Sequence, residues 1–64
     1  MLVLLRREGE SIVCRTKTGE RVVFAVLRME RNRVRVGVEA PLSITIDREE
    51  VDLRKHPELV NGNV

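Results

Sequence analysis

The chain has 64 residues, which is enough for one small domain and too few for a catalytic fold with separate cofactor and substrate lobes. Its single cysteine excludes an intrachain disulfide, and one Cys with one His cannot build a Cys/His zinc site. No apolar run approaches the roughly 18 residues of a membrane span, and a lone cysteine suits a reducing compartment. We therefore expect a soluble cytoplasmic module that needs no cofactor and is not an enzyme.

Charge is distributed unevenly along the chain. Residues 1–38 hold nine basic and four acidic groups, whereas residues 39–64 hold three and six. Ten of the 12 cations are Arg, whose planar guanidinium reads phosphates and base edges, so the composition favours a nucleic-acid partner. The chain has no Trp or Tyr and one Phe, which excludes recognition by stacking bases on an aromatic platform.

The first half of the chain predicts three strands. Residues 2–5 are continuously apolar, which indicates a strand buried on both faces. Residues 11–15 predict a second short strand, and the turn that follows ends at Gly19, which takes a positive φ at low cost. Residues 20–29 predict a third strand that is again apolar on both faces.

Two further strands are predicted after a turn at Glu30-Arg31-Asn32-Arg33, in which Asn32 tolerates the left-handed conformation. Residues 33–38 alternate Val with Arg or Gly, so one face of this strand is expected in the core and the other is basic. Ala40-Pro41 ends that strand, because proline lacks the N–H that a sheet needs. Residues 43–46 alternate again and predict a fifth strand.

A short helix is predicted after the fifth strand. Asp47 occupies the position of an N-cap, and Glu50 follows three residues later as in a capping box. Pro57 ends the helix after about two turns. We place the domain at residues 1–59 and a polar tail at residues 60–64.

The predicted strands and helix of one chain are too few to bury the apolar strand faces. One five-stranded sheet and a two-turn helix cannot cover both faces of the strands at residues 2–5 and 20–29, whereas a second copy of the chain can. The alternative is a marginal monomer with an exposed apolar patch. The sequence thus predicts a mostly β homodimer, each chain having five strands and a short C-terminal helix.

Several reactive side chains are expected to have structural roles. Glu49 and Glu50 are neighbours on the helix and point about 100° apart, so they do not form an acid/base pair. His56 follows the last helical cations and is expected as an exposed side chain that complements the helix dipole. Cys14 is expected as a small core residue.

Arginines gather at three places that suit an anionic partner. Arg6 and Arg7 close the first strand, Arg33 and Arg35 share one strand face, and Arg48 falls at the first helical position. The N-terminus of a helix aims free N–H groups outward and favours a phosphate, which distinguishes Arg48 from the others. Taken singly, each of these residues is more often a solvated surface charge than a contact.

Six short motifs also occur in a specific order over residues 1–53. They are Met1-Leu2-Val3-Leu4, Arg6-Arg7, Gly9-Glu10-Ser11-Ile12, Val34-Arg35-Val36-Gly37-Val38, Ala40-Pro41 and Arg48-Glu49-Glu50-Val51. In this order and at this spacing they resemble the carbon storage regulator family, the bacterial CsrA/RsmA translational regulators.

The resemblance implies an intertwined homodimer in which strand one of each chain pairs with strand five of the other. Members of the family bind GGA in the loops of messenger-RNA hairpins, often over the ribosome-binding site, and repress translation or alter mRNA stability. Small RNAs with many such loops sequester them, and a flagellar assembly protein antagonises some.

The resemblance also implies an RNA site shared between two chains. Its strand-one side comprises Leu4, Arg6 and Arg7. Its strand-five side comprises the backbone of Ala40, Leu42 and Ile46 and the side chain of Arg48, which matches the arginine on which RNA binding most depends. Unpaired main-chain groups on a strand edge recognise guanine in an unstacked loop, which suits a chain without aromatic platforms.

The chain departs from the family pattern near this site. Leu5 stands where Ser or Thr is common, Leu42 where Lys is common, and Asp47 where His is common, and the connection after residue 14 is about four residues longer. We expect these changes to affect RNA affinity. A dimeric adaptor that acts through protein partners is the alternative, followed by a β-strand DNA-binding dimer.

Overall fold

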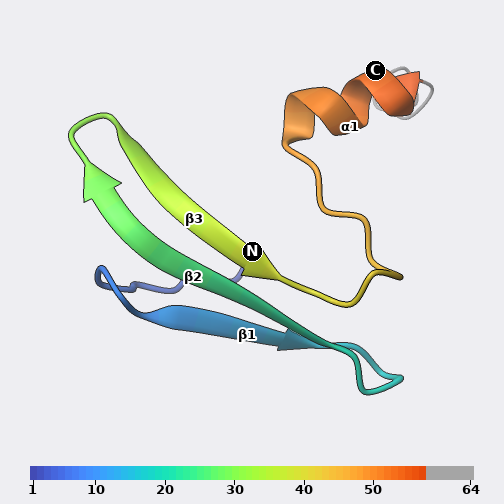
Figure 1. Ribbon diagram of the computed structural model, residues 1–64, viewed down its shortest axis with the longest axis horizontal. Coiled ribbons are helices and arrows are strands. Elements are labelled where there is room, and N and C mark those ends of the chain that lie inside the picture. The colour runs from blue at the N-terminus through green and yellow to red at the C-terminus, as the bar shows by residue number, and fades with distance from the viewer. Residues whose placement is uncertain (58–64) are drawn as a thin grey trace.

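The structure is a computed structural model that describes residues 1–57 and contains one antiparallel sheet followed by a short helix (Figure 1). The strands are β1 (Ser11–Arg15), β2 (Arg21–Glu30) and β3 (Arg33–Glu39), in the order β1-β2-β3, and the helix is α1 (Glu49–Lys55). A mostly β chain with a short C-terminal helix is thus confirmed. The domain boundary predicted after residue 59 and the tail at residues 60–64 lie outside the described residues.

Two tight turns connect the three strands. The β1–β2 turn has Gly19 at φ +89°, as predicted, and the Gly19 N–H donates to the carbonyl of Thr16 at 3.0 Å. The β2–β3 turn is only two residues long, because Glu30 pairs with Arg33. Asn32 does not use the left-handed conformation that it tolerates, since no residue other than glycine among those described has a positive φ. A two-residue turn usually matches the twist of its strands through residues with positive φ, and this turn has none. The register shift between Val26 and Arg28 provides local twist in β2 and β3 instead.

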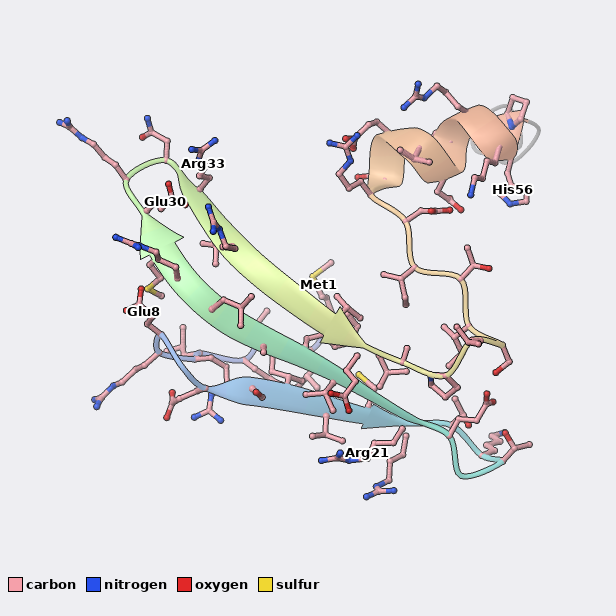
Figure 2. All side chains as sticks on the ribbon, viewed as in Figure 1. Met1, Glu8, Arg21, Glu30, Arg33 and His56 are labelled. Atoms are coloured by element: carbon pink, nitrogen blue, oxygen red, sulfur yellow. The ribbon has the colours of Figure 1, made fainter. Side chains whose placement is uncertain are left out.

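Both faces of the sheet carry apolar side chains, and one of them also carries Arg28 and Arg35. Directly opposed residues lie on the same face, so Ile12, Phe24 and Val38 form one row across the three strands. On the opposite face, Leu27 lies over Gly37, where an added Cβ would come within 3.2 Å of it. The predicted apolar faces of β2 are therefore present, and the side chains spread to both sides of the sheet (Figure 2).

One chain does not bury these faces. Val22, at 7% exposure, is the one residue of the described part that is classed as buried, and Val36 in β3 remains 51% exposed. The accessible surface is 6142 Å², whereas a compact monomer of 7.4 kDa exposes about 4,200 Å². The radius of gyration, 14.2 Å, likewise exceeds the roughly 11 Å of a compact domain of this length. The single chain therefore forms a sheet but does not enclose a hydrophobic core.

The predicted strands at residues 2–5 and 43–46 are not strands in the single chain. Residues 1–6 form no backbone–backbone hydrogen bond with another described residue. Within residues 40–47, the one such bond runs from the Ile44 N–H to the Pro41 carbonyl, at 3.0 Å. A strand requires a neighbouring strand for its hydrogen bonds, and neither segment has one here.

Two predicted features lie at the ends of the elements. Cys14 is exposed rather than in the core, because β1 is an edge strand on which no element packs at this end. The helix ends at Lys55, two residues before Pro57, as predicted, and the N–H of His56 donates to the Asp52 carbonyl at 2.9 Å. His56 is exposed at the end of α1 (Figure 2).

The helix stands apart from the sheet (Figure 1). Within the described residues, α1 contacts none of the three strands and contains no buried residue. An extended segment, residues 40–48, connects it to the end of β3. Among residues 1–57, no helix has the length and apolar content needed to cross a membrane.

Candidate nucleic-acid interface

Glu10 organises the first group of predicted site residues. Its carboxylate accepts the Arg7 backbone N–H at 2.6 Å and forms an ion pair with the Arg6 guanidinium at 2.9 Å. The Arg7 hydrogen bond, followed by the positive charge of Arg6, lowers the pKa of Glu10 against an opposing desolvation effect. Arg6 also donates to the Ser11 carbonyl at 3.2 Å, so its guanidinium is oriented by β1. Leu4, further along the same segment, is half exposed.

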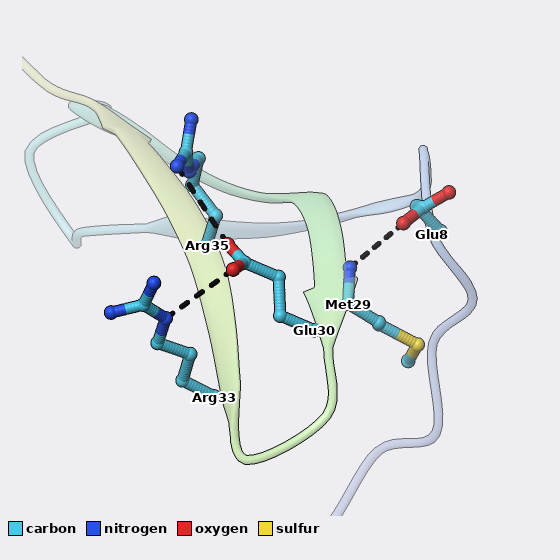
Figure 3. A network of polar contacts seen from close by, with 5 residues as sticks. All are labelled: Glu8, Met29, Glu30, Arg33 and Arg35. Atoms are coloured by element: carbon cyan, nitrogen blue, oxygen red, sulfur yellow. Dashed lines mark hydrogen bonds and ion pairs between the residues drawn. The ribbon is translucent and has the colours of Figure 1, made fainter.

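The conformation of Gly9 and the hydrogen bonds of residues 8–10 to β2 fix the point at which residues 1–6 leave the sheet. Gly9 has φ +87°, a conformation that other residues rarely adopt, and its N–H donates to the Val26 carbonyl at 2.7 Å. The Glu8 carboxylate accepts the N–H of Met29 at 2.7 Å (Figure 3). Residues 8–10 are therefore attached to β2, while residues 1–6 project from it with their backbone groups unpaired.

The second group of predicted site residues lies after β3. Ala40 is half buried, Ile46 is 45% exposed, and Leu42 is fully exposed at the Pro41–Ile44 turn. Ser43 in that turn donates to the Glu20 carboxylate at 2.6 Å. The backbone around Leu42 is thus open on one side and attached to the sheet through its neighbour.

Arg48 occupies the N-cap position of α1, and the prediction that Asp47 caps this helix is wrong. No side chain makes a capping hydrogen bond, and the Asp47 carboxylate instead forms an ion pair with Lys55 at 2.9 Å. This contact satisfies the carboxylate with a full positive charge, which competes with the weaker N–H donors of the first turn. Arg48 is also one residue earlier than predicted, just before the first helical position.

The Arg48 side chain is available to a ligand. It is 75% exposed, and its Nε lies 3.1 Å from a Glu50 carboxylate oxygen. An exposed ion pair of this kind contributes only about 0–1 kcal/mol, so a phosphate competes with it readily. Neighbouring Asp47 is the opposing influence, because its carboxylate repels phosphate.

The single chain does not unite the two groups. Among the described residues, no hydrogen bond or ion pair joins residues 4–7 to residues 40–48, and α1 lies away from the sheet (Figure 1). Each group combines a segment that has few backbone hydrogen bonds with exposed Arg side chains.

A third group of arginines surrounds the β2–β3 turn. The Glu30 carboxylate lies 3.3 Å from Arg33 Nε and 3.7 Å from Arg35 Nη2 (Figure 3). Arg33 and Arg35 therefore share a strand face, as predicted, and Glu30 offsets part of their charge. Arg28 opposes Arg35 directly in the ladder.

Sequence reasoning missed two carboxylates that organise these surfaces. Glu30 was predicted only as a turn residue, although its position three residues before Arg33 is a usable signal. Glu20 and Ser43 were not singled out, because they are 23 positions apart and only the fold brings them together. No group of three or more His, Cys, Asp or Glu side chains among the described residues could hold a metal ion.

Comparison with known proteins identifies the family. Residues 1–56 match the profile of CsrA, described as a global regulator protein family. A protein of Thermotoga petrophila called translational regulator CsrA is 45% identical over 64 residues, covering 100% of this chain and 68% of that protein. Proteins of the same name from Nocardioides and Geobacter metallireducens are 47% identical over 51 residues and 41% identical over 58 residues. These alignments cover 80% and 91% of this chain and 57% and 69% of the relatives.

No solved structure matches the chain. The family profile nevertheless covers nearly all of the described residues, including both groups of predicted site residues. The resemblance in the order of the short motifs is thereby confirmed, and the chain belongs to the CsrA family of global regulator proteins.

Proposed function

We propose that this protein is an RNA-binding post-transcriptional regulator that binds GGA-containing hairpin loops of mRNA near the ribosome-binding site. Bound there, it represses translation or alters mRNA stability. The observation that carries the proposal is that residues 1–6 form no backbone–backbone hydrogen bond with a described residue, and residues 40–47 form one, while exposed arginines lie beside both segments at Arg6, Arg7 and Arg48. Main-chain groups and Arg side chains are sufficient to read a guanine-rich loop, so the absence of stacking aromatics is no obstacle.

The proposal includes a second copy of the chain. Residues 2–5 of one chain would pair with residues 43–46 of its partner, giving each of these apolar segments the hydrogen bonds that it lacks alone. The chain exposes about 1,900 Å² more than a compact monomer of its mass, which falls in the range that each partner buries in an obligate dimer. Two identical sites would result, each combining Leu4, Arg6 and Arg7 of one chain with Arg48 of the other.

Partners follow from the same chemistry. Messenger RNAs with accessible GGA loops would be the targets, and small RNAs that carry several such loops would compete for the protein. A message with two well-spaced GGA loops would bind more tightly than one with a single loop, because the second contact is intramolecular. A flagellar assembly protein is a further candidate antagonist.

Binding to three ligands tests the proposal. They are a hairpin with a GGA loop, the same hairpin with the loop changed, and duplex DNA of equal length. We expect tight binding of the first alone at about 0.15 M salt, with affinity that falls as salt rises because arginines displace counterions from phosphates. Equal binding of both hairpins would leave only electrostatic attraction and favour the adaptor function. Preference for the duplex would favour a DNA-binding dimer.

A further inference from the structure

Glu20 stands at the centre of a hydrogen-bond network beside the β1–β2 turn. Its carboxylate accepts the Ser43 hydroxyl at 2.6 Å and the Thr18 hydroxyl at 3.2 Å, one on each oxygen. Its backbone N–H donates to the Thr16 hydroxyl at 3.1 Å, and its carbonyl accepts the Thr16 N–H at 3.0 Å. Glu20 is therefore held from both its backbone and its side chain.

Several hydrogen bonds hold this network on the side of the β1–β2 turn. Thr16 and Thr18 lie 3.0 Å apart through their hydroxyl oxygens, and Gly19 closes the turn with its positive φ. The lowered pKa of Glu20, caused first by the Ser43 hydrogen bond and then by Thr18, keeps the carboxylate ionised and a strong acceptor. The turn thus presents a fixed oxygen to Ser43.

Ser43 connects the segment that follows β3 to the β1–β2 turn. Among the described residues, the bond from Ser43 to Glu20, the residue just before β2, is the one side-chain hydrogen bond that joins residues 40–48 to residues 1–39. The Ile44 N–H bond to Pro41 closes the turn around Ser43. Fixing Ser43 therefore restricts the backbone of Leu42 on one side and of Ile44 on the other.

We propose that Glu20 is a positioning residue for the RNA site, acting through Ser43 to hold the backbone of residues 40–46 in the conformation that reads the loop. This inference rests on the proposed function. Glu20 makes no contact with the RNA. It lowers the entropic cost of RNA binding, because fewer conformations of residues 40–46 remain to be ordered when the RNA binds. The longer β1–β2 connection, with Thr16 and Thr18, is the part of the chain that makes the anchor possible.

Two simpler roles for Glu20 predict different results. If Glu20 acts only through its charge, removing the carboxylate relieves repulsion of phosphate and tightens RNA binding. If it only stabilises the β1–β2 turn, Ser43 is dispensable for RNA affinity. Positioning requires both partners and makes their effects non-additive.

The experiment is a double-mutant cycle read by affinity for the GGA hairpin. We expect Glu20→Ala and Ser43→Ala each to weaken binding by about fivefold to tenfold, and the double variant to be no weaker than either alone. Glu20→Gln, which keeps an acceptor oxygen, and Ser43→Thr, which keeps the hydroxyl, should remain within about threefold of the parent. Glu30→Ala is the matched control, because it removes a carboxylate of equal charge whose contacts, Arg33 and Arg35, lie at the β2–β3 turn.

Amide hydrogen exchange without RNA separates this inference from the proposed function. Glu20→Ala and Ser43→Ala should raise exchange at residues 42–46 by at least about tenfold, whereas Glu30→Ala should not. If the parent fails to prefer GGA but exchange rises as expected, the proposed function is wrong and the anchor stands. If the parent prefers GGA while both variants match it in affinity, or if their effects are additive, the positioning role of Glu20 is overturned.

Discussion

Within one chain, the sheet and the two segments that flank it differ in how many backbone hydrogen bonds they form and in how much of their apolar surface is buried. In β1, β2 and β3 the backbone is paired along antiparallel ladders, which are interrupted at the register shift between Val26 and Arg28, and the apolar area of the two faces remains open. In residues 1–6 and 40–47 both the backbone and the apolar side chains are open. Local pairing therefore builds a sheet in this chain, and we propose that a second copy supplies the burial and the remaining backbone partners.

The largest expected effect is on folding itself. If apolar faces and open segments are completed by a second chain, unfolding is coupled to dissociation, and the unfolding midpoint rises with concentration. Each tenfold increase in chain concentration should add about 1.4 kcal/mol of apparent stability. Thermal unfolding across a concentration series, with sedimentation to measure mass, checks this. A compact, folded monomer at micromolar concentration would contradict the account.

The next effect concerns the exposed arginine before α1. Arg48→Ala should weaken binding of the GGA hairpin by about 30-fold, roughly 2 kcal/mol, because a charge-assisted contact is lost. Folding stability should change by less than about 0.5 kcal/mol, since the side chain is exposed and its ion pair with Glu50 is a surface contact.

Arg54→Ala is the matched control for this prediction. Arg54 is also an arginine of α1, and its Nε donates to the Glu50 carbonyl at 3.3 Å within the helix. Its removal should change RNA affinity by less than about threefold, the effect of a single remote charge. Parent-like binding by a dimeric Arg48→Ala variant would shift the balance to the adaptor function.

A smaller effect in the opposite direction is expected at Asp47. Asp47→His removes a negative charge beside Arg48 and should tighten RNA binding by about threefold, as expected from relieved repulsion at the surface. Because Asp47 does not cap the helix but pairs with Lys55, the stability cost should stay within about 1 kcal/mol. Lys55→Met breaks the same pair and leaves the Asp47 charge, so it should lower stability without tightening binding. Weaker binding by Asp47→His would show that the carboxylate helps the site.

The smallest expected effect is a pH dependence of folding stability that arises from Glu10, which lies in the segment attached to β2. The pKa of Glu10 is lowered in the folded chain, first by the Arg7 N–H, so its contribution to stability is complete above the ordinary carboxyl pKa and is lost as pH falls through the lowered value. The difference in melting temperature between the parent and Glu10→Gln should therefore shrink between about pH 6 and about pH 3. A constant or growing difference would mean that the Arg6 and Arg7 contacts are not maintained in solution.

Prediction from sequence succeeded where a local pattern decides the structure. The Val alternation specified β3, Gly19 specified a turn, and the apolar run of β2 specified a strand with two faces to cover. These features depend on neighbours a few residues away, and the hairpin partners are adjacent in sequence. The family motifs specified which residues to examine at the two open segments.

Prediction failed where a contact between distant residues decides the structure. Asp47 has the residue type and spacing of a helix cap, yet Lys55 attracts its carboxylate. Cys14 has the apolar neighbours of a core residue, yet it lies on an edge strand that nothing covers in the single chain. The anchor between Glu20 and Ser43 leaves no signal in either local sequence.

We propose that each RNA site combines residues 4–7 of one chain with Arg48 of the other. Mixed dimers provide the most direct test of this shared site. One chain carries Arg6→Ala and Arg7→Ala, the other carries Arg48→Ala, and neither homodimer should bind the GGA hairpin tightly. After subunit exchange, half of the dimers are mixed and each has one intact site, so about a quarter of all sites should regain the affinity of the parent. No recovery, with exchange verified by mass, would contradict the shared site, because a site built within one chain would keep one of the two defects in every dimer.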